Sequence, residues 1–367
     1  MRTVRLIYVM AGIGISAWAV TVPFAKIRFG LNDAALGLIL LAPGVGGIMA
    51  MPLAGLCVSR LGSKLTLLIV GTVFGLMLPI LAIAPTSDAF AVLLFLFGAV
   101  FAVTDIAMNA QAVATEARSG GLLMSSFHAM YSVGALSVAG LTSILLRFGA
   151  TNVMCATLSG AAVFAILAQH RFLQSKSEDP AADGAAFARP NQATLVLGLC
   201  CFACFMTEGA VTDWSTIFLR FSRGIGIASA FYGYVAFAVA MAVTRLAGDR
   251  IAGRFGKPVV MRVGSLMAGG GMMLAVSTPF EVTDVAGFAL VGLGVGNVAP
   301  LVLSAASRVQ GISANVSVPA VMTLGYGGFL LGPVLIGLVA NATSLAAAFG
   351  LIAVMLAALS LAGRAVK

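Results

Sequence analysis

Long apolar runs, separated by short polar segments, make up almost the whole chain. We place twelve of them, each about 20 residues long or more, which is enough for a helix to cross a bilayer. Only 9% of the 367 residues are charged and 60% are hydrophobic, whereas a soluble domain carries roughly 25% charged residues. We therefore exclude a soluble protein and predict an all-α membrane protein with twelve transmembrane helices. The predicted spans are 6–25, 34–57, 65–84, 89–112, 121–145, 151–169, 193–216, 227–247, 259–278, 284–303, 315–340 and 343–362.

Lysine and arginine residues are divided unequally between alternate loops. With twelve spans, 16 of the 21 basic residues fall on one side, Arg245 among them, and 5 fall on the other. Cytoplasmic loops of bacterial membrane proteins are enriched in these residues. We therefore predict a multi-pass protein of the bacterial inner membrane with both termini in the cytoplasm. The first run has features of a signal peptide, but we expect it to remain as the first span.

The same pattern argues against several classes of function. Nucleic-acid-binding proteins gather basic residues on one solvated face, whereas these are scattered between apolar runs, so we expect no nucleic-acid partner. The sequence has no nucleotide-binding loop of the G-x-x-x-x-G-K-[ST] type. Cys201-x-x-Cys204 has no histidine or second cysteine pair beside it, so we expect neither a metal nor another cofactor. No set of catalytic groups recurs at one depth, and we do not expect an enzyme.

One long polar stretch, residues 171–192, contains two prolines and both signs of charge. We predict a cytoplasmic linker there, between an N-terminal six-helix bundle (1–170) and a C-terminal one (193–367). Matching residues recur at nearly constant spacing in the two bundles, which indicates a duplication. The pairs are Trp18 and Trp214, Arg60 and Arg254, and Tyr131 and Tyr326, separated by 196, 194 and 195 residues.

The loops after the second and eighth spans share glycines and basic residues. They resemble the loop signature of the major facilitator superfamily, G-x-x-x-D-R-x-G-R-R, in both halves. With the six-plus-six layout, this resemblance covers the whole chain and implies a major facilitator fold and secondary transport. The residues that carry it, and that we expect to act in gating, are Gly55, Arg60, Gly62, Lys64, Asp249, Arg250, Arg254, Gly256 and Lys257.

The first copy of this signature departs from the family pattern. Ser59 stands where the family usually has an aspartate, which predicts a weaker or different conformational lock in that half. The arginines can cap helix ends or pair with carboxylates in one state and release them in another. The alternative is that these basic residues only set the topology.

Three further segments are similar to a bacterial branch of the superfamily near the sugar-permease-like members. They are residues 104–111, 127–134 and 207–214. This resemblance refines the family and does not supply a substrate. A small polar solute such as a sugar or a sugar derivative suits the polar side chains of the spans, which are Asp105, Asn109, Gln111 and Glu208.

Ionisable groups inside spans are costly and therefore mark functional positions. In the first half, Asp105 and Asn109 share a helix face at a spacing of four residues, and Tyr131 follows His128 by three. Asp105 and His128 fall at comparable depth on adjacent helices. We predict a polar cluster of these four residues, in which Asp105 and His128 carry protons and Asn109 and Tyr131 contact the substrate. The alternative is a buried pair that only joins the fourth and fifth spans.

In the second half, the seventh span contains Glu208 and Asp213. We predict that Glu208 faces the transport cavity and takes part in both proton coupling and substrate binding; the alternative is an inert buried role. Asp213 is expected either to pair with Arg220 or Arg223 near the outer rim or to be a solvated helix end.

Two tryptophans occupy related positions in the first helix of each half. Trp18 and Trp214 can stack on a sugar ring, or they can anchor the chain in the aromatic belt at the membrane surface. The residues predicted to bind substrate are Asn109, Tyr131, Glu208, Trp18, Trp214, Tyr326 and Asn297.

The leading hypothesis is a proton-coupled transporter that takes up a small polar solute by alternating access, as a monomer in the lipid bilayer. A proton-driven exporter is the first alternative. Drug antiporters of the superfamily usually carry a G-x-x-x-G-P run in the fifth span, whereas here it lies in the eleventh, at residues 328–333, which disfavours that alternative. The second alternative is a membrane receptor or sensor that does not transport.

Overall fold

A computed structural model describes residues 1–119, 124–173, 191–310 and 314–366 of the chain. Within these residues the regular structure is helical, without strands. Eleven of the described helices are long and apolar enough to cross a membrane, and Asn152–Leu167 forms a shorter apolar helix. These twelve helical segments correspond one to one with the predicted spans.

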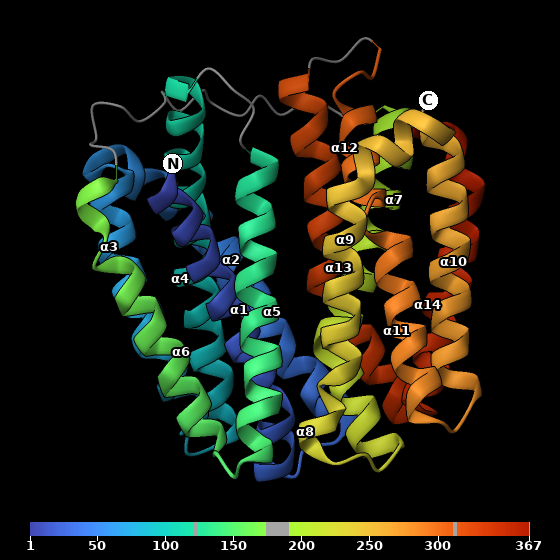
Figure 1. The fold of residues 1–367 in the computed structure, drawn as a ribbon, viewed down its shortest axis with the longest axis horizontal. Helices are drawn as coiled ribbons and strands as arrows, with labels where there is room; N and C mark the ends of the chain where they lie inside the picture. Colours follow the sequence, from blue (N-terminus) through green and yellow to red (C-terminus); the bar gives the residue numbers. More distant parts are fainter. Residues whose placement is uncertain (120–123, 174–190, 311–313, 367) are drawn as a thin grey trace. The chain divides into compact units, whose positions relative to one another are not determined.

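The chain folds into two compact units (Figure 1). The first comprises Met1–Leu31 and Ile39–Asp183, and the second comprises Asn32–Leu38 and Gly184–Lys367. Residues 174–190 lie outside the described part of the chain, so the predicted linker and its boundaries stay a prediction.

The first six spans are α1 (Arg2–Phe29), α2 (Asp33–Leu61), α3 (Ser63–Ala82), α4 (Ser87–Ser119), α5 (Met124–Arg147) and α6 (Asn152–Leu167), followed by η1 (His170–Phe172). The second six begin with α7 (Gln192–Ile217), which continues into a π-helical turn, η3 (Phe218–Ser222). They go on with α8 (Ile227–Ala230), α9 (Tyr232–Phe255), α10 (Lys257–Ser277), α11 (Glu281–Val295), α12 (Val298–Ala306), α13 (Ala314–Ala342), α14 (Leu345–Leu361) and η4 (Ala362–Val366).

Two helices extend well past the predicted ends of their spans. The apolar runs end near residues 112 and 247, but α4 continues to Ser119 and α9 to Phe255. Hydrophobicity reports where the chain leaves the lipid, whereas a helix continues in water as long as its backbone hydrogen bonds are made. The sequence pattern therefore located the spans better than the helix ends.

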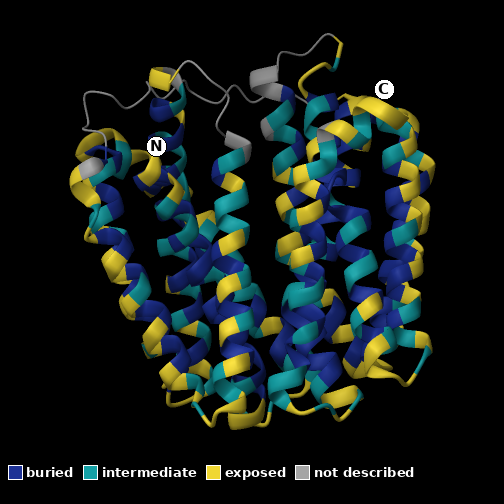
Figure 2. Cartoon of the chain, viewed as in Figure 1, coloured by how far each residue is buried: buried dark blue, intermediate teal, exposed yellow. Residues whose placement is uncertain are grey.

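The helices of the two units pack in the same way. In the first unit α1 packs against α5, and α3 packs against α4 and α6; in the second, α7 packs against α13, and α10 packs against α11 and α14. In order along each unit, the first span meets the fifth, and the third meets the fourth and sixth. Figure 2 shows that the buried residues of each unit lie along these helix contacts. The shared packing agrees with the predicted duplication.

Glycines allow the closest helix crossings, and these crossings recur at the same spacing. Gly98 of α4 lies against the Pro43 carbonyl of α2, and a Cβ atom there would overlap the carbonyl oxygen. In the second unit, Gly292 of α11 lies against the Phe237 carbonyl of α9 in the same manner. Gly292 lies 194 residues after Gly98, and Phe237 lies 194 residues after Pro43. Small residues at such crossings let membrane helices approach closely enough for dense packing.

The tight turns after the second span of each unit depend on glycine as well. Gly62, between α2 and α3, has φ 83°, and Gly256, between α9 and α10, has φ 81°. Residues with a side chain rarely adopt this conformation. Gly62 and Gly256 of the loop signature are therefore explained by the backbone of the turns that they form.

Candidate functional site

A polar cluster in the first unit joins α1, α4 and α5. The Tyr8 hydroxyl donates a hydrogen bond to Asn109 Oδ1 at 2.7 Å, and Asn109 Nδ2 donates to the Asp105 carbonyl oxygen at 2.8 Å. The His128 ring meets the Tyr8 ring edge-on, with centroids 5.2 Å apart. Asn109 and His128 thus contact one buried tyrosine, and Asp105 lies one helical turn before Asn109. Tyr131 follows on α5, and its backbone carbonyl oxygen faces Gly12 of α1.

Tyr8 is the member of this cluster that sequence reasoning missed. It lies in a long apolar run of the first span. Spacing along one helix cannot predict its contact with Asn109, because Asn109 is on a different helix. Its burial is complete, with 0% of the side chain exposed. A buried tyrosine hydroxyl normally has a hydrogen-bond partner, so a tyrosine early in the first span was the available signal for a polar partner on another helix.

An ion pair in the second unit joins α7 and α9. Arg245 Nη2 lies 2.8 Å from Glu208 Oε1, and Arg245 Nε donates to the Gly296 carbonyl oxygen at 3.3 Å. Both charged residues lie within candidate membrane spans, Gln192–Ser222 and Ile227–Gly248. Arg245 lies three residues before the end of its candidate span, as in the predicted span 227–247, and only the helix contacts reveal that it turns toward a carboxylate.

The tenth span is interrupted beside this ion pair. Between α11 and α12, residues Gly296 and Asn297 form a turn instead of continuing the helix. Asn297 is buried, and its side-chain amide lies against Gly248 of α9. Interrupted helices place carbonyl groups and amides inside membrane proteins at ligand and ion sites. The interruption thus brings a predicted substrate residue, Asn297, next to the helix that carries Arg245.

Tyr326 lies on α13 and is 43% exposed. Its ring packs against Phe205 of α7, with centroids 5.6 Å apart. The role of Tyr326 in substrate binding stays a prediction.

The expected partner of Asp213 was wrong. Arg223 pairs instead with Asp284 of α11, through Nε and Oδ2 at 3.1 Å and through Nη2 and Oδ1 at 3.3 Å. Arg220 donates to the Ile225 carbonyl oxygen. Asp213 is buried, with 8% exposed, so it is not a solvated helix end either. The sequence could not show this because Asp284, which forms the pair, comes 71 residues after Asp213.

Both tryptophans lie inside their own units. Trp18 is 8% exposed and packs against Phe97, with ring centroids 6.3 Å apart, and Trp214 is 0% exposed. An anchor in the aromatic belt contacts lipid, which this burial precludes for Trp214. In this conformation Trp214 also offers no surface to a solute, so its predicted role requires a different conformation.

The loop signature occupies corresponding helix ends in the two units. Lys257 Nζ, at the start of α10, donates to Ser304 Oγ at 3.1 Å. At the start of α3, Ser63 Oγ accepts a hydrogen bond from Gln111 Nε2 at 2.7 Å. Each bond ties the third span of a unit to the fourth. Ser59, in the place of the family aspartate, donates to the Leu56 carbonyl oxygen within α2.

The remaining signature residues are on the ends of the same helices. Gly55, Arg60 and Arg250 are exposed and Lys64 is half-buried, and the Arg254 guanidinium lies 5.5 Å from the centroid of the Phe255 ring. The side chain of Asp249 lies outside the described residues. Gating by these residues stays a prediction.

The cysteines are free thiols, and four of the five are buried. In the described part of the chain, no three His, Cys, Asp or Glu side chains are grouped closely enough to hold a metal ion.

Apolar helices in two bundles, with polar and ionisable groups held among them, define a multi-pass membrane protein. The chain belongs to the Major Facilitator Superfamily, whose family model matches residues 5–327. The predicted major facilitator fold with twelve helices in two six-helix halves is thereby confirmed. Because this family consists of transporters, the expectation that the chain is not an enzyme is confirmed as well.

Similar proteins support this assignment. An uncharacterized MFS-type transporter of Yersinia pestis is 41% identical over 364 residues, which cover 99% of this chain and 94% of that protein. The membrane protein MosC of Rhizobium meliloti is 31% identical over 339 residues, which cover 91% of this chain and 82% of MosC.

Solved structures share the fold at low sequence identity. The nucleoside transporter NupG aligns with a TM-score of 0.76 and 15% identity, covering 100% of this chain and 99% of NupG. A bacterial homologue of the human lysosomal transporter Spinster, in an inward-facing and occupied conformation, aligns with a TM-score of 0.75 and 16% identity, covering 99% of this chain and 95% of that one.

Proposed function

We propose that this transporter takes up a small polar solute, a sugar or a sugar derivative, together with protons by alternating access. In this proposal it works as a monomer in the bacterial inner membrane, with both termini in the cytoplasm. Residues 1–170 and 193–367 form its two halves, joined by the linker.

The cluster around Tyr8 is the observation that carries the proposal. A carboxylate and an imidazole can both carry protons near neutral pH in a protein interior. His128 meets the Tyr8 ring, and Asp105 lies one helical turn before Asn109, which accepts the hydrogen bond of Tyr8. Placing them within apolar helices is costly unless they have a function. The Tyr8 hydroxyl and the Asn109 amide beside them are groups that hydrogen-bond to solute hydroxyls. Proton exchange and solute binding can therefore be coupled in one place.

The test begins with a ligand search on the purified protein. A solute that binds the native state raises its thermal stability, so a library of polar metabolites is screened at an acidic and a neutral pH. Solutes that stabilise the protein are then added to proteoliposomes that contain a pH-sensitive dye. The expected result is solute-dependent proton movement into the liposomes.

Asp105→Asn is the decisive variant. It keeps the size of the side chain but cannot carry a proton, so we expect solute binding to persist while proton movement falls to the level of empty liposomes. Asp88→Asn is the matched control, because Asp88 is exposed in the first turn of the same helix. Proton movement that survives Asp105→Asn would refute the assigned role, and its absence with every binding solute in the wild type would refute proton coupling.

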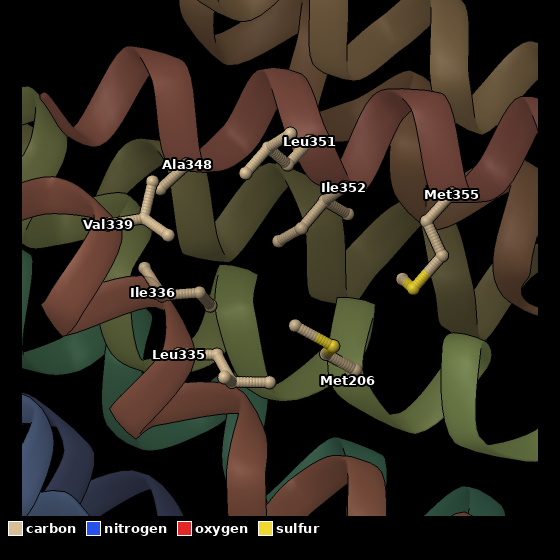
Figure 3. A pocket seen from close by; sticks show the side chains of 8 residues that line it. All are labelled: Met206, Leu335, Ile336, Val339, Ala348, Leu351, Ile352 and Met355. Atoms are coloured by element: carbon tan, nitrogen blue, oxygen red, sulfur yellow. The ribbon is translucent and has the colours of Figure 1, made fainter. Parts of the chain in front are cut away.

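An exporter of amphiphilic compounds is the second candidate, and a groove in the second unit favours it. Figure 3 shows this groove, which lies among α7, α13 and α14 and is lined by apolar side chains throughout. Its lining residues are Met206, Leu335, Ile336, Val339, Ala348, Leu351, Ile352 and Met355. Greater drug sensitivity of a deletion strain, restored to normal by the wild-type gene but not by a Met206→Lys variant, would favour export. Binding without flux in either direction would instead indicate a receptor.

A further inference from the structure

Two positive groups in the second unit converge on one uncharged oxygen. Lys257 Nζ, on the first residue of α10, and Arg308 Nη2, two residues after the end of α12, each donate to Ser304 Oγ at 3.1 Å. A serine hydroxyl can accept two hydrogen bonds, but it brings no negative charge. Neighbouring positive charges repel each other unless an anion lies beside them. The arrangement is therefore complementary to an anion.

The helices around this site carry no carboxylate that could neutralise it. The segments α10, α12 and η4 contain no Asp or Glu. The acids of α11, Glu281 and Asp284, are in its first turn, which follows the far end of α10. The side chain of Asp249, on α9, lies outside the described residues. Within the described part of the chain, neither Lys257 nor Arg308 forms an ion pair.

Further cations gather at the same end of the second unit. The segment η4 packs against both α10 and α12. The Arg262 side chain, on the second turn of α10, lies against Gly363 of η4, and Arg364 is the next residue of η4. These segments meet at the end of the unit that is marked C in Figure 1. We call this group the basic patch; its members are Lys257, Arg262, Arg308 and Arg364.

The first unit provides an internal comparison, because its corresponding residues are uncharged. Gln111 Nε2 donates to Ser63 Oγ at 2.7 Å and so joins the third span to the fourth without any positive group. The two cations of the second unit are therefore not required for this bond, and setting the orientation of the chain does not require them to converge. The corresponding residues are Ser63, Gln111 and Thr115, which lie 194, 193 and 193 residues before Lys257, Ser304 and Arg308.

The basic patch lies where two candidate spans reach the membrane surface. Lys257 is the first residue of one candidate span, and Arg308 comes two residues after the end of the next. Cations at the ends of spans lie at the depth of lipid headgroups. Directly inside the span of Lys257, the side chains of Val259 and Val263 are 47% and 57% exposed, and acyl chains can cover them. A phospholipid supplies both the anion and the apolar chains, whereas a soluble phosphate supplies the anion alone.

We propose that the basic patch binds the headgroup phosphate of an anionic phospholipid, held by Lys257 and Arg308 on either side of Ser304. Phosphate oxygens accept hydrogen bonds from lysine and arginine, and such charge-assisted bonds are stronger than neutral ones. A headgroup without a positive charge of its own is favoured, because nothing in the lipid then opposes the cations of the protein. The inference goes beyond the proposed transport function and does not depend on which solute is transported.

The experiment uses the purified full-length protein in detergent micelles to which one lipid is added. Dioleoylphosphatidylglycerol is compared with dioleoylphosphatidylcholine, which has the same chains and phosphate but a compensating positive charge. A lipid that binds the native state raises its thermal stability, and native mass spectrometry detects the lipid that is retained. For the wild type we expect saturable stabilisation by phosphatidylglycerol and much less by phosphatidylcholine. Inorganic phosphate tests the soluble source of the same chemistry and should not stabilise the protein.

Two substitutions remove the positive groups. Lys257→Gln and Arg308→Gln should each raise the phosphatidylglycerol fraction needed for half-maximal stabilisation by about fivefold, the usual contribution of one cation near an anionic membrane surface. The double variant should show a larger shift than either single one. Arg2→Gln with Lys64→Gln is the matched control, because it removes the same number of charges from the starts of the first and third spans of the first unit. It should respond to phosphatidylglycerol as the wild type does.

Ser304→Asp tests the same site without removing a positive charge. The introduced carboxylate can pair with both Lys257 and Arg308, so it takes the place of the lipid phosphate. In the absence of lipid we expect this variant to be at least as stable as the wild type, and we expect it to lose the response to phosphatidylglycerol. It therefore decides the question if the glutamine variants do not fold.

Several results would each overturn the inference. The first is equal stabilisation of the wild type by the two lipids, and the second is stabilisation by inorganic phosphate that matches that by phosphatidylglycerol. The third is a phosphatidylglycerol response that survives in the double glutamine variant or in Ser304→Asp. The last is a loss of response in the control of Arg2 and Lys64 as large as that in the double variant.

Discussion

The Arg223–Asp284 ion pair provides a direct test of how this structure is stabilised. Asp284 is completely buried, and Arg223 bonds to both of its carboxylate oxygens, at 3.1 and 3.3 Å. Removing one partner of a buried ion pair costs about 3–5 kcal/mol, because the other charge is left buried without compensation. After Asp284→Ala, Arg223 keeps a bond to the Ala275 carbonyl oxygen, a contact with the Phe218 ring and 19% exposure. We therefore expect a loss near the lower end, about 3 kcal/mol.

Equilibrium unfolding in mixed micelles, followed by tryptophan fluorescence, measures this loss. Asp284→Asn keeps one acceptor for Arg223 and should cost less, about 1–2 kcal/mol. In a double-mutant cycle, Arg223→Ala and Asp284→Ala together should cost less than the sum of the two single changes. Glu281→Ala, in the first turn of the same helix, should change stability by about 0.5 kcal/mol or less. An effect of Asp284→Ala no larger than that of Glu281→Ala would refute the reasoning.

Two further predictions concern the helix crossings and the polar cluster. Gly292→Ala places a Cβ atom against the Phe237 carbonyl and should lower the midpoint of thermal unfolding. Gly270→Ala, whose Cβ atom would meet nothing within 4 Å, should leave that midpoint unchanged. Equal midpoints for the two variants would contradict the close packing. Tyr8→Phe removes the hydrogen bond to Asn109 and should lower stability by about 1 kcal/mol. The same variant should also slow solute-driven proton movement in proteoliposomes, and a wild-type rate would exclude the Tyr8 hydroxyl from coupling.

The polar cluster of the first unit shows which contacts the spacing along a helix can predict. Asp105 and Asn109 were placed on one face because four residues are close to one helical turn. In the structure the Asn109 amide donates to the backbone carbonyl oxygen of Asp105. His128 was assigned to the same depth from helix rise alone. Tyr8 was not found, since its partner is 101 residues away on another helix and no local spacing encodes that contact.

Arg245 shows what a count of basic residues leaves out. The count placed Arg245 on the side predicted to be cytoplasmic, near the end of the predicted span 227–247. In the structure it lies on α9, three residues before the end of a candidate span, and pairs with Glu208. The count could not show this partner, because the contact depends on the packing of α7 against α9.

The sequence by itself determined that the chain spans the membrane and how many times it crosses, and it predicted that the two halves arose by duplication. These properties depend on hydrophobicity and on repetition along the chain, which are local or periodic. The tertiary structure decided which carboxylate pairs with which arginine, where the tenth span is interrupted, and which side chain completes the cluster around Asp105. Such contacts join residues that lie far apart in the chain. Their free energy depends on both groups being buried together, so neither residue alone indicates its partner.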